Sequence, residues 1–103
     1  MKKIINFDKN AQKELNKFDI VVQREFAGLI KKLEADGKLN FPEAKKLKNN
    51  LFEIRIKING AYRGFYGYIK GTTIIILHFF HKKSQKTPTK NLKLAENRLK
   101  QYK

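Results

Sequence analysis

Apolar and polar residues alternate over residues 51–58, which is the pattern of a β-strand with one buried face. The apolar side chains at positions 52, 54, 56 and 58 share one face. The other face carries Glu53, Arg55 and Lys57, and we expect it to be wet and mostly charged. Because an Asn-Gly pair follows at 59 and 60, and both residue types tolerate a positive φ, the strand is predicted to turn into a hairpin.

Two further strands complete a predicted antiparallel meander. Residues 61–70 are rich in aromatic side chains and include Arg63, and residues 73–81 are almost entirely β-branched or aromatic until the run ends at His81. The Gly-Thr pair at 71 and 72 provides the turn between them. An antiparallel sheet can face water on one side, and we expect that side to present basic groups.

Helical spacing of apolar residues flanks this meander on both sides. After a predicted edge strand at 2–7, Asp8 or Asn10 can cap a helix with apolar positions 11, 15 and 18. Asp19 can cap a second helix that runs to about residue 35, with apolar positions 22, 26, 29, 30 and 33, and the Asp-Gly pair at 36 and 37 ends it. A last helix is predicted to start at Pro88, with Thr87 as its cap, and to reach about residue 102.

These elements define an α+β domain. Residues 38–50 are predicted to form a connector with a brief helical turn at 44–47. The order is then β-α-α-β-β-β-α, in a single domain spanning residues 1–103. We expect an antiparallel sheet with a helical hairpin packed on one face, followed by a C-terminal helix.

Basic residues are concentrated on the predicted sheet and its flanks. The chain carries a net charge of +15. Residues 44–95 contain twelve basic residues and a single acid, Glu53, whereas residues 1–43 are nearly balanced. Because a positive field this concentrated attracts polyanions, nucleic acid is the expected partner, although an acidic protein fits the charge equally well.

Several classes of site and location are excluded by what the sequence lacks. With no cysteine and only two histidines, it offers neither disulfides nor a convincing metal site, and its glycines form no phosphate-binding loop. No cofactor is expected. The two N-terminal lysines precede an apolar run too short for a signal peptide, and no run approaches the ~18 residues of a membrane span. We therefore expect a cytoplasmic protein with no membrane partner.

Arg55 and Arg63 are the leading candidates for a site on the open face of the sheet. Arginine binds phosphate through paired, permanently charged donors, and histidine can transfer protons near neutral pH. On the third strand His78, Phe80 and Lys82 share one face and positions 79, 81 and 83 the other, and alternation does not decide which set joins the arginines. Such a face can bind RNA passively, or cut it with the 2′-hydroxyl as nucleophile, and composition does not separate the two.

Four stretches of the chain, in this order and spacing, resemble one family. They are LFEIR at 51–55, YR at 62–63, LHFFHKK at 77–83 and QKTP at 85–88. They resemble the HigB-type, phage-derived Gp49-like branch of the RelE/ParE toxin superfamily. The resemblance extends over nearly the whole chain, and it implies a RelE-like fold and a toxin of a type II toxin–antitoxin system. It also implies metal-independent cleavage of mRNA on the ribosome, and a cognate antitoxin that commonly carries a helix-turn-helix domain.

The resemblance further implies which side chains take part in catalysis and RNA binding. The candidate catalytic residues are Arg55, Arg63, His78, His81 and Lys83. The resemblance also implies that Lys82 and Lys86 bind the RNA backbone. The basic connector and the polar face of the first meander strand add Lys45, Lys46, Lys48 and Lys57 to the expected RNA contacts. Tyr102 is expected in the packed face of the last helix, so the general base stays unassigned. Because the superfamily includes gyrase-poisoning ParE relatives, a gyrase-directed toxin stays open as an alternative, as does a non-catalytic protein that binds RNA or an antitoxin.

Overall fold

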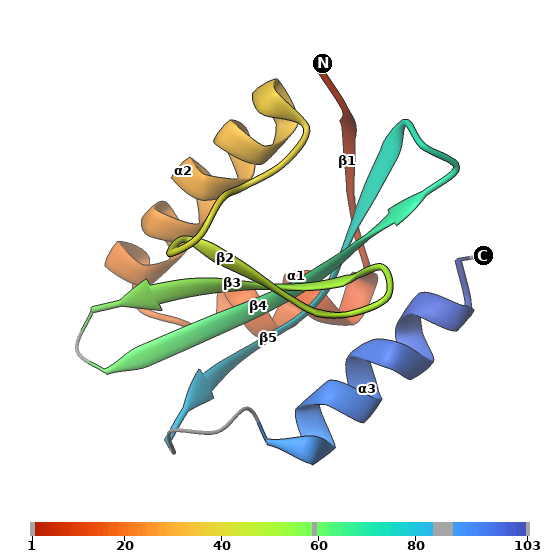
Figure 1. Ribbon diagram of the computed structural model, residues 1–103. Helices are drawn as coiled ribbons and strands as arrows, with labels where there is room; N and C mark the ends of the chain where they lie inside the picture. Colours follow the sequence, from red (N-terminus) through yellow and green to blue (C-terminus); the bar gives the residue numbers. More distant parts are fainter. Residues whose placement is uncertain (1, 59, 84–87, 103) are drawn as a thin grey trace.

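The computed structural model describes residues 2–58, 60–83 and 88–102. Within these residues the chain forms three helices and five strands (Figure 1). In chain order they are β1 (Ile4–Phe7), α1 (Lys9–Asn16), α2 (Ile20–Asp36), β2 (Ala44–Lys48), β3 (Leu51–Lys57), β4 (Ala61–Ile69), β5 (Thr73–Lys82) and α3 (Thr89–Lys100). No helix in this described part is both long enough and apolar enough to cross a membrane.

The five strands form one sheet in the order β1-β5-β4-β3-β2. Strands β2 to β5 pair antiparallel with their neighbours, as the alternation predicted for the meander, whereas β1 runs parallel to β5. The expected α+β class and order of elements are confirmed, with one added strand and one parallel pair at an edge.

Strand β2 corrects the expectation of a connector with a helical turn at 44–47. The apolar residues Ala44 and Leu47 are three positions apart, which favours a helical turn over a strand. The strand forms because a tight turn folds it back onto β3. In that turn Asn50 adopts a left-handed φ of 58°, and its side-chain amide exchanges two hydrogen bonds of 2.8 Å with the backbone of Tyr68. The lysines at 45, 46 and 48 therefore lie on an edge strand.

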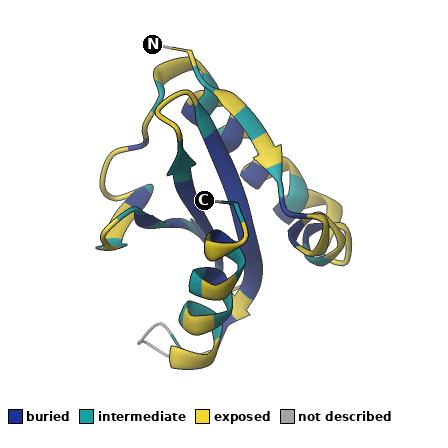
Figure 2. Cartoon of the chain, turned by 90° about the vertical axis from the view of Figure 1, so that its right-hand side faces the viewer, coloured by how far each residue is buried: buried dark blue, intermediate teal, exposed yellow. Residues whose placement is uncertain are grey.

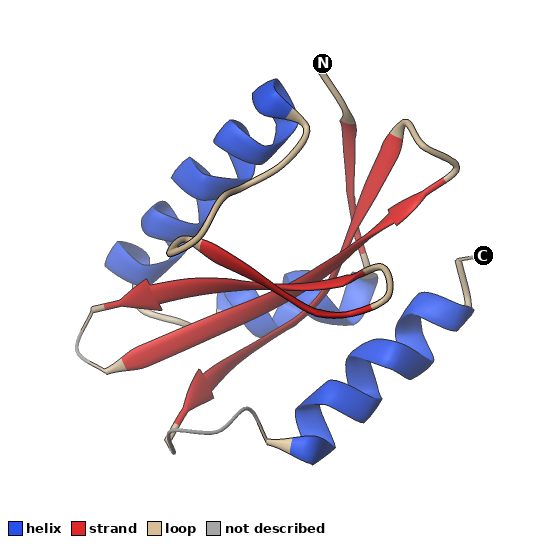
Figure 3. Cartoon of the chain, in the orientation of Figure 1, coloured by secondary structure: helices blue, strands red, loops and turns tan. Residues whose placement is uncertain are grey.

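Helices α1 and α2 cover one face of the sheet (Figure 3). Asp8 caps α1, because its carboxylate accepts hydrogen bonds from the backbone N–H groups of Asn10 and Ala11. Asp19 stands at the N-cap of α2 without a side-chain capping bond, and α2 ends at Gly37 with φ 80° as predicted. The core that these helices share with the sheet comprises Ala11, Leu15, Val22, Phe26, Ile30, Leu33, Leu39, Ala44, Ile54, Ile56, Tyr66, Ile74, Ile76 and Phe79.

Helix α3 packs on the opposite face and covers only one end of it. Its Ala95 and Leu99 join a second cluster with Leu51, Phe65, Ile75, Leu77 and Phe80. As a result Leu51, expected on a wet face, is 1% exposed. Glu53, expected on the same wet face, is also 1% exposed and lies beside Arg55 and Arg63. Further along β3, Arg55 and Lys57 stay accessible. The predicted cap Thr87 and the turn residue Asn59 lie outside the described residues, and Pro88 stands at the N-cap position of α3.

A bulge in β5 changes which of its residues face each core. Phe65 lies opposite His78, but the next residue, Tyr66, lies opposite Ile76, so Leu77 is the extra residue. An inserted residue shifts the alternation of a strand. Ile76 and Phe79 accordingly both pack toward α1 and α2. Figure 2 shows the buried residues gathered along the central strands, with exposed residues on the outer sides of the helices.

Candidate functional site

The register of three neighbouring strands places Arg55 and Arg63 side by side. Arg55 on β3 lies opposite Arg63 on β4, and Arg63 lies opposite Phe80 on β5. Residues directly opposed in a sheet share a face, and alternation adds Lys57 and Lys82 to that face. The even-numbered residues at the end of β5 therefore join the two arginines, which alternation alone did not decide.

Glu53 lies between the two arginines and is almost completely buried. Its Oε1 is 3.8 Å from the Nε of Arg55 and 3.7 Å from the Nε of Arg63. A buried carboxylate is tolerated only when cations and hydrogen bonds offset its lost hydration. Glu53 therefore holds both guanidinium groups close to the sheet. Since one carboxylate faces two arginines and lies opposite Lys45 in the β2–β3 pair, this end of the sheet keeps a surplus of positive charge.

Arg63 is the more deeply placed of the two arginines, with 5% of the residue exposed. Burial lowers the pKa of Arg63, the attraction of Glu53 opposes that effect, and the repulsion of Arg55 adds to it. Its Nη1 donates to the carbonyl oxygen of Tyr62 at 3.0 Å, and its buried Nε has no hydrogen-bond partner among the described residues. A desolvated guanidinium of this kind gains more from an incoming anion than an exposed one does.

Lys82 is 7% exposed and lies among other cations. Burial lowers the pKa of Lys82, and so does repulsion from Arg63, Arg55 and Lys45, while Glu53 acts in the opposite direction. Lys45 reaches this face because it lies opposite Glu53 in the β2–β3 pair. A lowered pKa increases the fraction of neutral amine near neutral pH, and a neutral amine can accept a proton.

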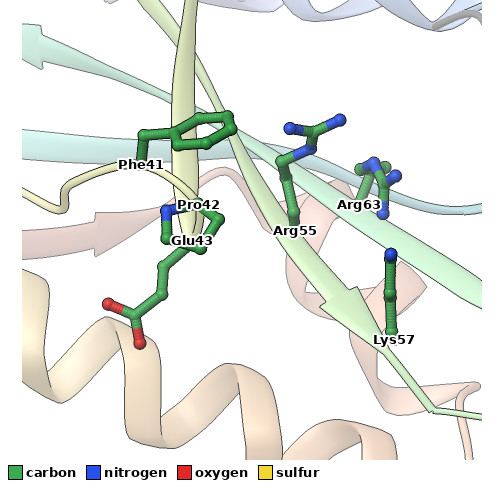
Figure 4. A pocket seen from close by; sticks show the side chains of 6 residues that line it. All are labelled: Phe41, Pro42, Glu43, Arg55, Lys57 and Arg63. Atoms are coloured by element: carbon green, nitrogen blue, oxygen red, sulfur yellow. The ribbon is translucent and has the colours of Figure 1, made fainter.

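A pocket of about 400 Å³ opens beside these cations. It is lined by Phe41, Pro42 and Glu43 from the segment before β2, together with Arg55, Lys57 and Arg63 (Figure 4). The arrangement offers an anion several cationic donors at one end of a hollow that also has an aromatic wall. It suits a ligand with a phosphate group and a flat, apolar part.

His78 lies on the same face of the sheet, but it is engaged in a different set of contacts. Its Nδ1 is 2.8 Å from Glu14 Oε1 and its Nε2 is 2.7 Å from Asn91 Oδ1. Arg98 adds two 3.0 Å bonds to the same Glu14 carboxylate. Burial would raise the pKa of Glu14, but hydrogen bonds from His78 and Arg98 and electrostatic attraction to His78 hold it at about 2. His78 therefore ties β5 to α1 and α3, and both of its ring nitrogens are occupied.

The structure does not bring the other predicted residues together at the arginines. His81 is exposed on the opposite face, where its ring stacks on Tyr62 with centroids 4.4 Å apart. Lys83 is exposed just beyond β5. Lys46 lies opposite Phe52, on the face of α1 and α2, and Lys48 pairs with Glu96 of α3 at 3.1 Å. Lys86 lies outside the described residues.

Three features of this site were not apparent from sequence. Phe41 and Pro42 stood in a predicted connector without any pattern, so their place on the pocket wall had no signal. The burial of Glu53 between the arginines did have a signal in the sequence, because Glu53 is the single acid in residues 44–95. The lowered pKa of Lys82 depends on neighbours from three other strands, which only the register reveals. Within the described part of the chain, no group of three or more carboxylate or histidine side chains lies close enough to hold a metal ion.

The fold is that of the RelE toxins. The chain is similar to an E. coli RelE toxin variant in the free state, at 14% identity over 98% of each chain with a TM-score of 0.70. It is also similar to a RelB–RelE antitoxin–toxin complex from Methanococcus jannaschii, at 22% identity over 75% of this chain and 89% of that one (TM-score 0.61). A toxin–antitoxin complex from Mycobacterium tuberculosis matches at 22% identity over 80% and 100%, respectively (TM-score 0.54).

Family membership comes from the sequence itself. The model of the phage-derived Gp49-like protein family (DUF891) matches residues 13–100, and the chain belongs to this family. No curated protein sequence matches the chain significantly. The expected Gp49-like family and the expected RelE-like fold are thus confirmed, while the narrower HigB-type assignment stays a prediction.

Proposed function

We propose that the protein is the toxin of a type II toxin–antitoxin system and that it cuts mRNA on the ribosome. The observation that carries this proposal is the cluster of Arg55, Arg63, Lys57, Lys82 and Lys45 on the end of the sheet that α3 leaves open. The RelE fold supports it, because the solved relatives are toxins and toxin–antitoxin complexes. The cognate antitoxin, with a helix-turn-helix domain, is part of the same proposal.

The reaction uses the 2′-hydroxyl of the substrate as its nucleophile. A base removes the hydroxyl proton, the 2′-oxygen attacks the adjacent phosphorus, and the bond to the 5′-oxygen of the next nucleotide breaks. An acid returns a proton to that 5′-oxygen, so the products are a 2′,3′-cyclic phosphate and a 5′-hydroxyl. The protein must bind the phosphate, stabilise its growing negative charge and place an acid and a base on opposite sides of it.

The arginines suit the phosphate role. Arg55 and Arg63 are adjacent across the β3–β4 pair and are both steered by buried Glu53. Their position is therefore fixed before substrate arrives, and cationic donors fixed in advance stabilise developing charge without reorganisation. Because Arg63 is largely removed from water, its attraction to a phosphate is screened less than that of a surface arginine.

The two lysines flanking Arg63 suit the proton transfers. Lys57 lies opposite Ala61, and Ala61 lies opposite Lys82. The two lysines therefore stand two strand spacings apart, roughly 10 Å between backbones, with Ala61 between them and the two arginines in the next row on the same face. Lys82, whose pKa is lowered, acts as the base, and the protonated amine of exposed Lys57 supplies the proton to the leaving oxygen. His78 is not given this role, because its nitrogens bond Glu14 and Asn91.

The proposal is tested by mapping mRNA 5′ ends in cells that express the chain inducibly. We expect growth arrest with new cuts inside translated codons. Arg55→Gln should abolish both, whereas Lys13→Gln, which removes one exposed positive charge from α1 on the opposite face, should leave both intact. Circular dichroism of the purified variants shows whether each one is folded.

The other outcomes identify the alternatives. Arrest with intact mRNA and DNA-damage signalling would refute mRNA cleavage and indicate gyrase as the target. Neither arrest nor cuts, with RNA binding retained by the folded protein, would indicate a non-catalytic binding protein.

A further inference from the structure

Phe41 is the most exposed large apolar side chain among the described residues, at 74%. It belongs to neither of the two buried clusters, so it contributes little to folding. Exposed apolar area of this size is unfavourable in water unless a ligand or partner covers it. Its position is specific, because it forms one wall of the pocket whose other lining residues include Arg55, Lys57 and Arg63.

The side chains around the pocket are turned so that the aromatic ring and the cations face a common space. Figure 4 shows the Phe41 ring directed toward Arg55, while the carboxylate of Glu43 points away from both. That carboxylate pairs with Lys32 of α2, with 2.8 Å between Nζ and Oε1. The one acid on the pocket wall is thus neutralised from outside, and the hollow itself stays cationic with an apolar, planar side.

We propose that this pocket is a nucleobase subsite, in which an unpaired base of single-stranded RNA stacks on Phe41. The inference rests on the proposed function, because it assumes that Arg55 and Arg63 hold a phosphate of the same strand. The base in the pocket belongs to a nucleotide next to that phosphate. Phe41 thus fixes which nucleotide lies over the cations, and it is a positioning residue in the proposed cleavage.

The chemistry of the pocket favours a nucleotide over other occupants. A nucleotide combines an anionic phosphate with a flat base, and the sugar joins the two. The faces of the base are apolar and its edges are polar. Single-strand binders use this combination, with aromatic side chains under the bases and a basic groove along the backbone. An apolar side chain of a protein partner would cover Phe41 but would leave the surplus positive charge of the pocket uncompensated. An acidic peptide would satisfy the cations and leave the ring exposed.

The test uses the absence of tryptophan from the chain. In the full-length Phe41→Trp variant the single indole reports stacking directly, because its fluorescence is quenched when a base lies against it. The probe is a short single-stranded oligoribonucleotide, 2′-O-methylated so that it cannot be cut, in a series in which each position in turn is abasic. We expect strong quenching by the complete strand, and loss of quenching when one particular base is removed.

Affinity measurements with matched variants give a second, independent readout. Phe41→Ala should weaken binding about 5- to 100-fold, the range for loss of one stacked base, without changing the salt dependence. Phe41→Tyr should restore affinity. Arg55→Gln should instead reduce the salt slope, because it removes a phosphate contact. Ile4→Trp is the control for an exposed indole at the opposite edge strand, where Ile4 is 59% exposed, and it should not be quenched.

The outcomes separate this inference from the proposed function. Base-dependent quenching without any cleavage on ribosomes would support the subsite and refute the nuclease. If the Phe41→Ala variant still cleaves mRNA, and every abasic strand quenches the indole as well as the complete strand does, the subsite is refuted and the nuclease is not. No binding of the oligonucleotide by the unchanged protein at low salt would also overturn it. Quenching by an acidic peptide but not by RNA would assign Phe41 to a protein partner instead.

Discussion

The contact between Glu14 and the His78–Arg98 pair should make the stability of the fold depend on acid pH in a specific way. The pKa of Glu14 is about 2 in the folded protein, against an ordinary value of 4.5. A carboxyl group with a lowered folded pKa stabilises the protein above its unfolded pKa, and that contribution disappears as the pH falls toward the folded pKa. The window is therefore between about pH 4.5 and about pH 2.

The expected magnitude follows from the same two values. Their difference corresponds to roughly 3 kcal/mol. Because a quarter of the Glu14 side chain is exposed to solvent, screening reduces this, and we expect about 2 kcal/mol. The variant Glu14→Gln keeps the size of the side chain and removes its charge. It should be about 2 kcal/mol less stable than the unchanged protein near neutral pH, and the gap should close as the pH falls through the window.

Urea unfolding followed by circular dichroism, at constant ionic strength and at several values from about pH 7 to about pH 2.5, measures that gap. Glu25→Gln is the matched control, because Glu25 is exposed on α2, and its curve should run parallel to that of the unchanged protein. A gap between Glu14→Gln and the unchanged protein that stays constant down to about pH 2.5 would refute the reasoning. So would a Glu14→Gln variant of unchanged stability at neutral pH.

Three further predictions concern packing, the anchoring of α3 and the proposed base. Gly67→Ala should lose about 1–3 kcal/mol of stability in thermal or urea unfolding, because the new Cβ would lie 2.8 Å from a backbone carbonyl oxygen of the β2–β3 turn. Gly28 lies on α2 with open space around it, so Gly28→Ala should gain up to about 1 kcal/mol of stability. The pKa of Tyr102 is raised by its hydrogen bond to Asp8, 2.7 Å long, so absorbance titration should show this phenol ionising above its ordinary value, and Asp8→Asn should lower it again. The cleavage rate should rise with pH because Lys82 must be neutral to act, and Lys82→Arg should remove the activity while the protein stays folded; a flat pH profile, or an active Lys82→Arg, would contradict that role.

Much of the fold could be predicted because alternation and helical spacing are local properties of the chain. The three meander strands and both N-terminal helices follow from such patterns, and the structure has them. Of the two caps expected for the first helix, Asp8 and Asn10, the structure uses Asp8. Strand β2 could not be predicted in this way. It is short, and its two apolar residues are three positions apart, which favours a helical turn over a strand. It forms because the Asn49–Asn50 turn folds it onto β3.

What covers each face of the sheet could not be predicted from alternation either. Alternation puts Leu51, Glu53 and Arg55 on one face, but Leu51 is buried in the cluster with α3, Glu53 is buried beside Arg55 and Arg63, and Arg55 stays accessible. The two histidines show the same limit. Both were candidates for proton transfer, but contacts from α1 and α3 engage His78 and the register places His81 on the other face. Electrostatic neighbours such as those of Lys82 come from several strands, so its pKa emerges only in the assembled sheet.

The most direct measurement of the central claim uses translating ribosomes programmed with one synthetic mRNA in two forms. One form is entirely ribonucleotide, and the other carries a single 2′-deoxy nucleotide immediately 5′ of the bond that is cut. We predict that the purified protein cuts the first form, leaving a 2′,3′-cyclic phosphate, and spares the second at that position. Equal cutting of both forms would contradict attack by the 2′-hydroxyl, and intact mRNA in both would contradict the assignment of the basic sheet face as a nuclease site.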